Sequence, residues 1–167
     1  MKNIVLVGFM GTGKTAVAKA LCRRLKMRYI STDALIEKNQ KRPIAEIFAK
    51  DGEEYFRRVE ADAVREVSAL QGAVIDAGGG VVIKEENIKL LKKSGTIVCL
   101  TASGDVILER TKGRRHRPLL NVEDPKKMIE ELLELRRPYY AKADFNVDTS
   151  GLSVDEVAKK ITDIASP

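Results

Sequence analysis

The run from Gly8 to Thr15, GFMGTGKT, matches the pattern G-x-x-x-x-G-K-[ST] at every fixed position. Glycines let a backbone curl around a phosphate with its N–H groups pointing inward, and the start of a following helix adds a positive dipole end. In such a loop Lys14 reaches the β- and γ-phosphates of ATP, and the Thr15 hydroxyl binds Mg²⁺. The candidate nucleotide contacts are Gly11, Thr12, Gly13, Lys14, Thr15 and Ala16.

The segments on both sides of this run fit a phosphate-binding loop. Residues 4–7 read as a short buried strand, and Ala16–Leu25 reads as a helix with one apolar face. Glycine-rich turns between a strand and a helix also occur for packing alone. Strand, full motif and helix together favour phosphate binding.

Two other sites of possible chemistry follow apolar runs. Asp33 comes just after residues 28–31, and open parallel sheets place their sites at this end of a strand. A carboxylate there can orient a substrate hydroxyl or accept its proton, although it can also be a simple helix N-terminal acid. The glycines at 78–80 follow residues 73–77, and their entropy cost favours close approach of backbone to a ligand.

A basic segment with a glycine and a proline, KGRRHRP, lies within residues 111–123. Positive charge and a mobile backbone are what a lid over phosphates needs, so we predict a lid here. An ordinary exposed loop is the alternative.

Five strand-like runs, at about 3–7, 28–31, 73–77, 96–100 and 145–148, alternate with helical patterns. This alternation predicts an α/β fold with a parallel sheet covered on both faces. Helix starts are indicated by Pro43, by Asp124 followed by proline, and by Ser153 with Glu156 as a capping box. We expect one domain over 1–167.

Composition narrows the class of protein further. The chain has 167 residues, 44% of them hydrophobic, which suffices for one proper core. It has no apolar run of about 18 residues, so we expect no membrane partner. Both cysteines sit in apolar patterns, which favours a cytoplasmic location.

The net charge of +6 comes without an arginine-rich tail or an RNP-type aromatic motif, so we expect no nucleic-acid partner. A site for two anionic small molecules, or a solvated basic surface, explains the surplus.

Four more patterns follow the loop: YISTD (29–33), FRRVE (56–60), DAGGG (76–80), and RPLL (117–120) with RRPYY (136–140). In this order they resemble the shikimate kinases, from Met1 to about Val157. The resemblance implies a three-layer α/β/α fold like that of nucleoside-monophosphate kinases. Its five-stranded sheet has the order 2-3-1-4-5, with a helical lid and a substrate-binding region at about 32–60. It also implies the use of ATP and Mg²⁺ to phosphorylate the 3-hydroxyl of shikimate. We expect the protein to be a monomer.

The resemblance also implies residue roles. Asp33 contacts the ring hydroxyls, Arg57 and Arg136 bind the shikimate carboxylate with help from the Gly79 N–H, and two aromatic rings line the apolar part of the pocket. The residues implied for shikimate binding are Asp33, Phe48, Phe56, Arg57, Gly78, Gly79, Gly80 and Arg136. The alternative for Arg57 is a surface ion pair with Glu53, Glu54 or Glu60.

On the nucleotide side, the resemblance places Arg117 of the lid on the transferring phosphoryl group. It places Arg110 against the adenine ring and the turn at Ser150 at the other edge of adenine. The implied catalytic residues are Lys14, Asp33 and Arg117.

One position departs from the family pattern. Shikimate kinases carry an acid that helps to hold Mg²⁺ at the place of Ser31, and a hydroxyl cannot supply that charge. Asp76, at the end of the third strand-like run, can take its place, so we predict Thr15 and Asp76 as the metal residues. The alternative is that Asp76 pairs with Lys14 or with a nearby arginine.

Two other functions remain open from the sequence. One is a related small-molecule kinase such as gluconate kinase, which would lack both the F-R-x-x-E pattern and the triple glycine. The other is a non-catalytic module that binds nucleotides or nucleic acid, against which the intact Lys14, Thr15, Asp33 and Arg117 argue.

Overall fold

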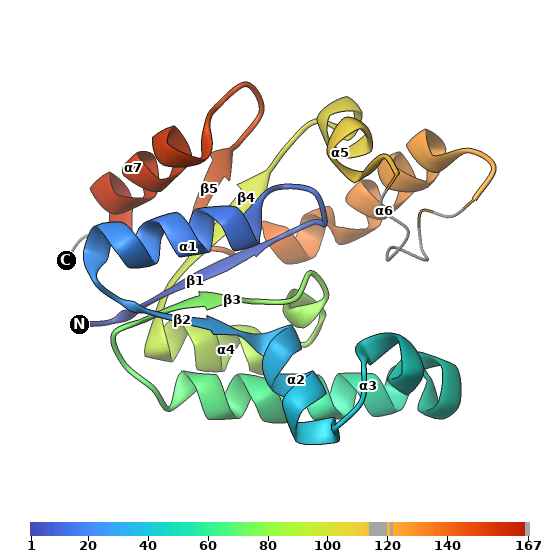
Figure 1. Ribbon diagram of the computed structural model, residues 1–167, viewed down its shortest axis with the longest axis horizontal. Helices are drawn as coiled ribbons and strands as arrows, with labels where there is room; N and C mark the ends of the chain where they lie inside the picture. Colours follow the sequence, from blue (N-terminus) through green and yellow to red (C-terminus); the bar gives the residue numbers. More distant parts are fainter. Residues whose placement is uncertain (114–119, 121, 166–167) are drawn as a thin grey trace.

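The computed structural model describes residues 1–113, 120 and 122–165. In this part of the chain, five parallel strands form a sheet of order β2-β3-β1-β4-β5 (Figure 1). The strands are Asn3–Gly8 (β1), Arg28–Ser31 (β2), Ala73–Asp76 (β3), Gly95–Thr101 (β4) and Phe145–Asp148 (β5). The predicted fold class, strand positions and strand order are confirmed.

Helices cover both faces of this sheet, as the alternating pattern predicts (Figure 1). Helices α1 and α7 pack on one face, and α3, α4 and α6 pack on the other. The described helices are α1 (Lys14–Leu25), α2 (Thr32–Gln40), α3 (Ile44–Ser68), α4 (Glu85–Ser94), α5 (Gly104–Thr111), α6 (Pro125–Tyr140) and α7 (Val154–Ala165), with a short 3₁₀ helix η1 (Val81–Ile83).

The central strand shows why the core has two halves. Successive side chains of a strand point to opposite faces. Ile4 and Leu6 therefore join the cluster under α1 and α7, whereas Val5 and Val7 join the cluster under α3, α4 and α6. All of β1 is buried, which is typical of a parallel strand covered on both sides.

The predicted helix starts are confirmed. The Asp124 carboxylate accepts the Lys127 N–H at 3.1 Å before Pro125 opens α6. At α7 the Ser153 hydroxyl accepts the Glu156 N–H at 3.2 Å, and the Glu156 carboxylate accepts the Ser153 N–H at 2.7 Å, as in a capping box.

The region predicted to bind substrate, residues 32–60, comprises α2 and the first part of α3. Helix α3 is interrupted at Gly52, whose φ of 81° and ψ of 176° are not helical. Its two segments enclose a small separate core with α2, built around Ile36, Ile47 and Phe56. Helix α2 directly follows the end of β2, and the first part of α3 lies beside α2 (Figure 1).

The predicted lid, residues 111–123, begins at the last residue of α5 and ends just before α6. Residues 114–119 and 121, which include Arg117, lie outside the described residues. Among the helices that the structure describes, none is both long and apolar enough to span a membrane.

Candidate active site

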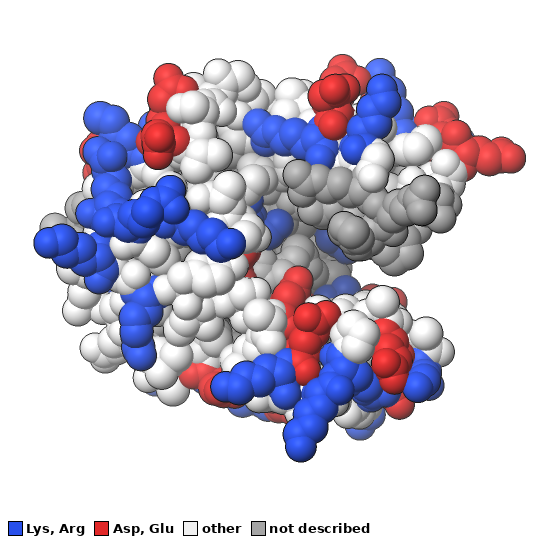
Figure 2. Space-filling model, in the orientation of Figure 1, with Lys and Arg blue, Asp and Glu red and all other residues white. Residues whose placement is uncertain are grey.

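A cavity of about 690 Å³ opens at the carboxyl ends of β1, β2 and β3. Figure 2 shows the molecule hollowed on this side, between the part that carries α2 and α3 and the part that carries α5 and α6. The phosphate-binding loop lies at one end of the cavity and the triple glycine at the other. One cavity therefore joins the two groups of residues that the sequence predicts for nucleotide and substrate.

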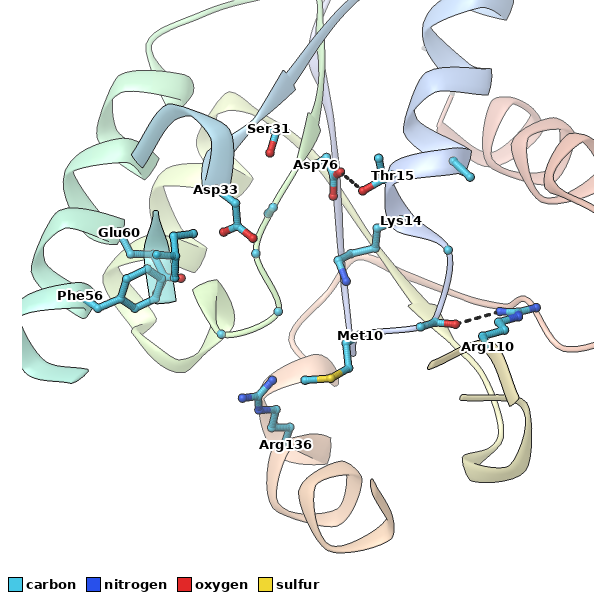
Figure 3. Close-up of a pocket in the computed structure, with 18 of the residues that line it drawn as sticks. Met10, Lys14, Thr15, Ser31, Asp33, Phe56, Glu60, Asp76, Arg110 and Arg136 are labelled. Carbon is cyan, nitrogen blue, oxygen red and sulfur yellow. Dashed lines mark hydrogen bonds between the residues drawn. The ribbon is translucent and has the colours of Figure 1, made fainter. Parts of the chain in front are cut away.

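The loop after β1 has the shape that phosphate binding requires. Gly13 caps α1 with a φ of 92°, a conformation that residues with side chains rarely adopt. Helix α1 begins at Lys14, so its positive dipole end faces the loop. The Lys14 side chain extends from the start of α1 into the cavity (Figure 3). Its ammonium donates to the carbonyls of Gly8 at 2.8 Å and Phe9 at 3.1 Å.

Asp76 accepts hydrogen bonds from two hydroxyl groups. Its Oδ2 accepts from Thr15 Oγ1 at 2.6 Å and from the Tyr29 hydroxyl at 3.0 Å. Burial and the Asp76 charge raise the pKa of Tyr29 to about 12, so the phenol keeps its proton and acts as a donor. In the sheet, Asp76 is the register partner of Ser31, the place of the absent acid.

The donor set at this position fits Mg²⁺. A carboxylate and a hydroxyl are hard oxygen ligands, and Mg²⁺ keeps several waters and takes its other ligands from substrate phosphates. The described residues contain no group of three or more His, Cys, Asp or Glu side chains that could form an all-protein metal site. A site completed by water and nucleotide is what Thr15 and Asp76 can support.

Asp33 stands at the start of α2 and points into the cavity (Figure 3). Its helix begins here because the Ser31 hydroxyl accepts the Ala34 N–H at 3.2 Å. Desolvation raises the pKa of Asp33 above its ordinary value, the Lys14 and Arg57 charges oppose the rise, and the Asp76 charge adds to it. A carboxylate with a raised pKa is a better proton acceptor at neutral pH.

The three glycines after β3 each face a different predicted substrate residue. A Cβ on Gly78 would lie 2.7 Å from Asp33 Oδ1, and one on Gly79 would lie 3.4 Å from Arg136 Nη1. A Cβ on Gly80 would collide with the Arg57 guanidinium. A larger residue at 78 or 80 would therefore displace Asp33 or Arg57, whereas a Cβ at 79 would only come into contact with Arg136.

Arg57 is paired before any substrate arrives. It donates to Glu60 at 2.7 Å and, more weakly, to the exposed Glu53 at 3.4 Å. Glu60 is only 2% exposed, and burial raises the pKa of its carboxyl while Arg57 lowers it. The buried Arg57 Nε has no hydrogen-bond partner among the described residues, and the residue also lines the cavity.

Arg136 reaches the cavity from α6, on the side opposite α3 (Figure 3). Its guanidinium carbon lies 5.6 Å from the centre of the Phe9 ring. One turn later on α6, the Tyr140 hydroxyl donates to the Gly79 carbonyl at 3.0 Å. Helix α6 thus fixes both an arginine and the glycine turn beside it.

Arg110 lines the nucleotide end of the cavity from α5. It donates to the Gly11 carbonyl at 3.2 Å and to Thr149 Oγ1 at 2.9 Å (Figure 3 shows the first bond). Ser150 closes the turn after β5, where its hydroxyl accepts the Ser103 N–H at 3.1 Å.

The structure brings most of the predicted residues together, with some outside the cavity lining. Phe48 is 40% exposed and packs on the Phe56 ring with 4.5 Å between centroids, and only Phe56 of the pair is a lining residue among those described. Thr12 is a buried residue of the phosphate-binding loop, and neither it nor Ser150 is among the described residues that line the cavity. The roles of all the predicted site residues, Arg117 included, stay predictions.

The sequence analysis assigned no role to Thr32, Tyr29 and Thr149, and it named Glu60 only as a possible surface partner of Arg57, whereas Glu60 is buried. Glu60 had a visible signal, since it lies three positions after Arg57 on one helix face. Thr32 accepts the Gly78 N–H at 2.9 Å and joins α2 to the glycine turn, while Tyr29 and Thr149 act through contacts across the sheet. Those three depend on strand neighbours, which a single strand's sequence does not reveal.

A phosphate-binding loop at the head of α1, on a five-stranded parallel sheet with a cavity at its carboxyl edge, defines the class of P-loop kinases that act on small molecules. The comparisons with known proteins are more specific. A family model described as shikimate kinase matches residues 10–166. The chain belongs to the shikimate kinase family.

Individual relatives agree. The chain is 51% identical over 161 residues to a shikimate kinase of Thermodesulfovibrio yellowstonii, covering 96% of this chain and 93% of the relative. It is 50% identical to one of Caldanaerobacter subterraneus, with 96% and 94% covered. A shikimate kinase of Acinetobacter baumannii, solved in complex with shikimate, superimposes with a TM-score of 0.93 at 34% identity, covering 98% of this chain and 92% of that one.

Proposed function

We propose that this protein transfers the γ-phosphoryl group of ATP to the 3-hydroxyl of shikimate. The observation that carries the proposal is the single cavity, which holds the phosphate-binding loop at one end and Asp33, Arg57, Arg136 and the glycine turn at the other. The family membership and the shikimate-bound relative from Acinetobacter baumannii support the same acceptor.

At the nucleotide end, the backbone N–H groups of residues 11–16 would bind the phosphates, and Lys14 would bridge the β- and γ-phosphates. Lys14 now donates to two loop carbonyls, so its ammonium already lies where the phosphates would replace them. Arg110 would lie against adenine, and Ser150 would stand at its other edge. Phosphoryl transfer needs position and charge neutralisation more than covalent chemistry, and these groups supply both.

At the acceptor end, Asp33 would hold the 3-hydroxyl and take its proton. Arg57 and Arg136 would offer guanidinium forks to the shikimate carboxylate, because both point into the cavity from opposite sides. The Gly79 N–H would assist them, and the rings of Phe56 and Phe48 would border the apolar part of the ring. Arg117 would neutralise the charge that develops on the transferring group.

Thr15 and Asp76 would hold Mg²⁺, the Thr15 hydroxyl as a ligand and the Asp76 carboxylate directly or through water. The ion would supply positive charge to the phosphate oxygens. Thr15 is well placed for this role because its hydroxyl proton already points at Asp76, which leaves the oxygen lone pairs for the ion.

A coupled assay that follows ADP formation from ATP tests the proposal. Shikimate should stimulate turnover far above the rate with water, whereas gluconate and nucleoside monophosphates should not. Turnover with gluconate alone would favour the related small-molecule kinase. ADP binding without turnover on any acceptor would favour a nucleotide-binding module.

We also propose that the protein works as a monomer in the cytoplasm, without nucleic acid or membrane partners. The free thiols of Cys22 and of the buried Cys99 support a reducing compartment. Analytical ultracentrifugation with and without shikimate and ADP tests the monomer.

A further inference from the structure

Thr149, directly after β5, has a buried hydroxyl group that the proposed mechanism does not use. The residue is 2% exposed. Its Oγ1 accepts from Arg110 at 2.9 Å, and it lies 3.0 Å from the Thr101 carbonyl and 3.2 Å from the Thr12 carbonyl. A hydroxyl has one proton to donate, so it is shared between these two carbonyls while the oxygen accepts from Arg110.

Arg110 extends the same network to the phosphate-binding loop. Its Nη1 also donates to the Gly11 carbonyl at 3.2 Å, and its Nη2 donates to the Thr149 carbonyl at 3.1 Å. The end of β5, the end of β4, helix α5 and the loop after β1 therefore meet at Thr149. Among the described residues, this network links two consecutive loop carbonyls, those of Gly11 and Thr12, to the opposite wall of the nucleotide end.

The consequence concerns the direction of a backbone N–H. The C=O and N–H of one trans peptide group point in opposite directions. The Thr12 carbonyl, held by Thr149, therefore fixes where the Gly13 N–H points. Gly13 itself has no side chain to set its conformation and caps α1 without a side-chain hydrogen bond.

We propose that Thr149 is a positioning residue for the nucleotide, which joins the phosphate-binding loop and Arg110 into one unit before ATP binds. The inference rests on the proposed use of ATP and names a residue that this use requires. Thr149 acts through the Thr12 carbonyl on the phosphates and through Arg110 on the base. Removal of the Thr149 hydroxyl therefore weakens the binding of ligands that carry phosphate, with or without adenine.

The replacement Thr149→Val keeps the shape of the side chain and removes the hydroxyl. We expect the dissociation constants of ADP and of inorganic pyrophosphate, measured by calorimetry, to rise about 5- to 30-fold, equivalent to about 1–2 kcal/mol. The KM for ATP should rise by a similar factor, with shikimate affinity unchanged. Thr149→Ser, which keeps the hydroxyl, should restore ADP affinity to within about twofold of the original.

Thr162→Val is the matched control. Thr162 lies on α7, where its hydroxyl donates to the Ala158 carbonyl at 2.9 Å, so the same atoms are removed away from the cavity. Nucleotide affinity should not change in this variant. Equal weakening in Thr149→Val and Thr162→Val would show a general loss of stability and overturn the inference.

Arg110→Met provides a second test that stands if Thr149→Val does not fold. Because Arg110 donates to the Gly11 carbonyl, this variant should bind pyrophosphate as well as ADP more weakly. If only ADP affinity falls, Arg110 acts only on the base, and the proposal that Thr149 joins Arg110 to the phosphate-binding loop is wrong. If the unchanged protein binds neither ADP nor pyrophosphate, the proposed function fails; if it binds both and Thr149→Val binds them equally well, only this inference fails.

Discussion

Replacing Arg57 with alanine removes a substrate fork and, at the same time, the partner of a buried carboxylate. Arg57 faces the cavity, yet it donates to Glu60 at 2.7 Å. Glu60 is only 2% exposed, so little water can solvate its carboxylate charge when Arg57 is absent. The variant should therefore fail in two separable ways, in shikimate binding and in folding stability.

The magnitudes follow from the burial of each pair. Truncating one partner of a desolvated, hydrogen-bonded charge pair costs about 2–5 kcal/mol, so shikimate affinity should fall by about 30-fold to a few thousand-fold. Leaving Glu60 as an unpaired buried charge costs about 3–5 kcal/mol of folding free energy. The double variant Arg57→Ala with Glu60→Gln should recover most of the stability and none of the shikimate affinity.

The pH dependence distinguishes this account from a general loss of packing. Burial raises the pKa of Glu60 in the folded protein, and Arg57 now limits that rise. Without Arg57 the folded pKa rises further above the unfolded value. Between those two pKa values the folded state binds more protons than the unfolded state, so stability falls as pH increases through this window. As pH rises above the unfolded pKa of Glu60, Arg57→Ala should lose more stability than the unchanged protein.

The assays are shikimate and ADP calorimetry, with urea unfolding at several pH values between 5 and 8. Arg58→Ala is the control, because it removes the same charge from the neighbouring, exposed position of α3. ADP affinity should stay the same in both variants. Unchanged shikimate affinity in Arg57→Ala would show that Arg57 is only part of an ion pair. A pH dependence equal to that of Arg58→Ala would refute the role of Glu60.

Three further predictions concern other parts of the molecule. Lys14→Ala should lower turnover by about 100- to 1000-fold with an unchanged circular dichroism spectrum. Near-normal turnover in this variant would contradict the proposed role of the phosphate-binding loop. Asp76→Asn should raise the Mg²⁺ concentration for half-maximal activity, and the Mn²⁺ dissociation constant by electron paramagnetic resonance, about 10- to 100-fold. Ser31→Ala should change both little, and Ser31→Asp should restore part of the loss in Asp76→Asn; an unchanged metal dependence in Asp76→Asn would remove Asp76 from the metal site. Ser153→Ala should lower the melting temperature by about 2–4 °C by removing the cap of α7, whereas activity at 25 °C should hold.

Local sequence patterns were sufficient to predict the strands, the helices and the nucleotide end of the site. The strands at 3–7 and 28–31, the capping box at Ser153 and the loop from Gly8 to Thr15 are all contained in short stretches of sequence. Each depends on backbone preferences and on side chains a few residues apart. The phosphate-binding loop was predictable for the same reason, because its glycines, lysine and threonine act within a single turn.

Contacts across the sheet were decided only by the tertiary structure. That Ser31 and Asp76 are register partners depends on how β2 pairs with β3, and the sequence of either strand is compatible with other registers. The burial of Glu60 depends on how α3 packs against the glycine turn, although its place three residues after Arg57 is local.

Thr149 is the clearest example of a residue whose contacts depend on the tertiary structure and not on the local sequence. It stands 39 residues from Arg110 and 137 from Thr12 along the chain, and nothing in its neighbourhood of sequence indicates either partner. The hydroxyl meets them because β5 and β1 both flank β4 and end at the same edge of the sheet. Parallel pairing brings the carboxyl ends of strands that are distant in sequence to the same edge of the sheet. The local sequence therefore shows which residues have suitable side chains, and the order of the strands determines which of these residues contact one another.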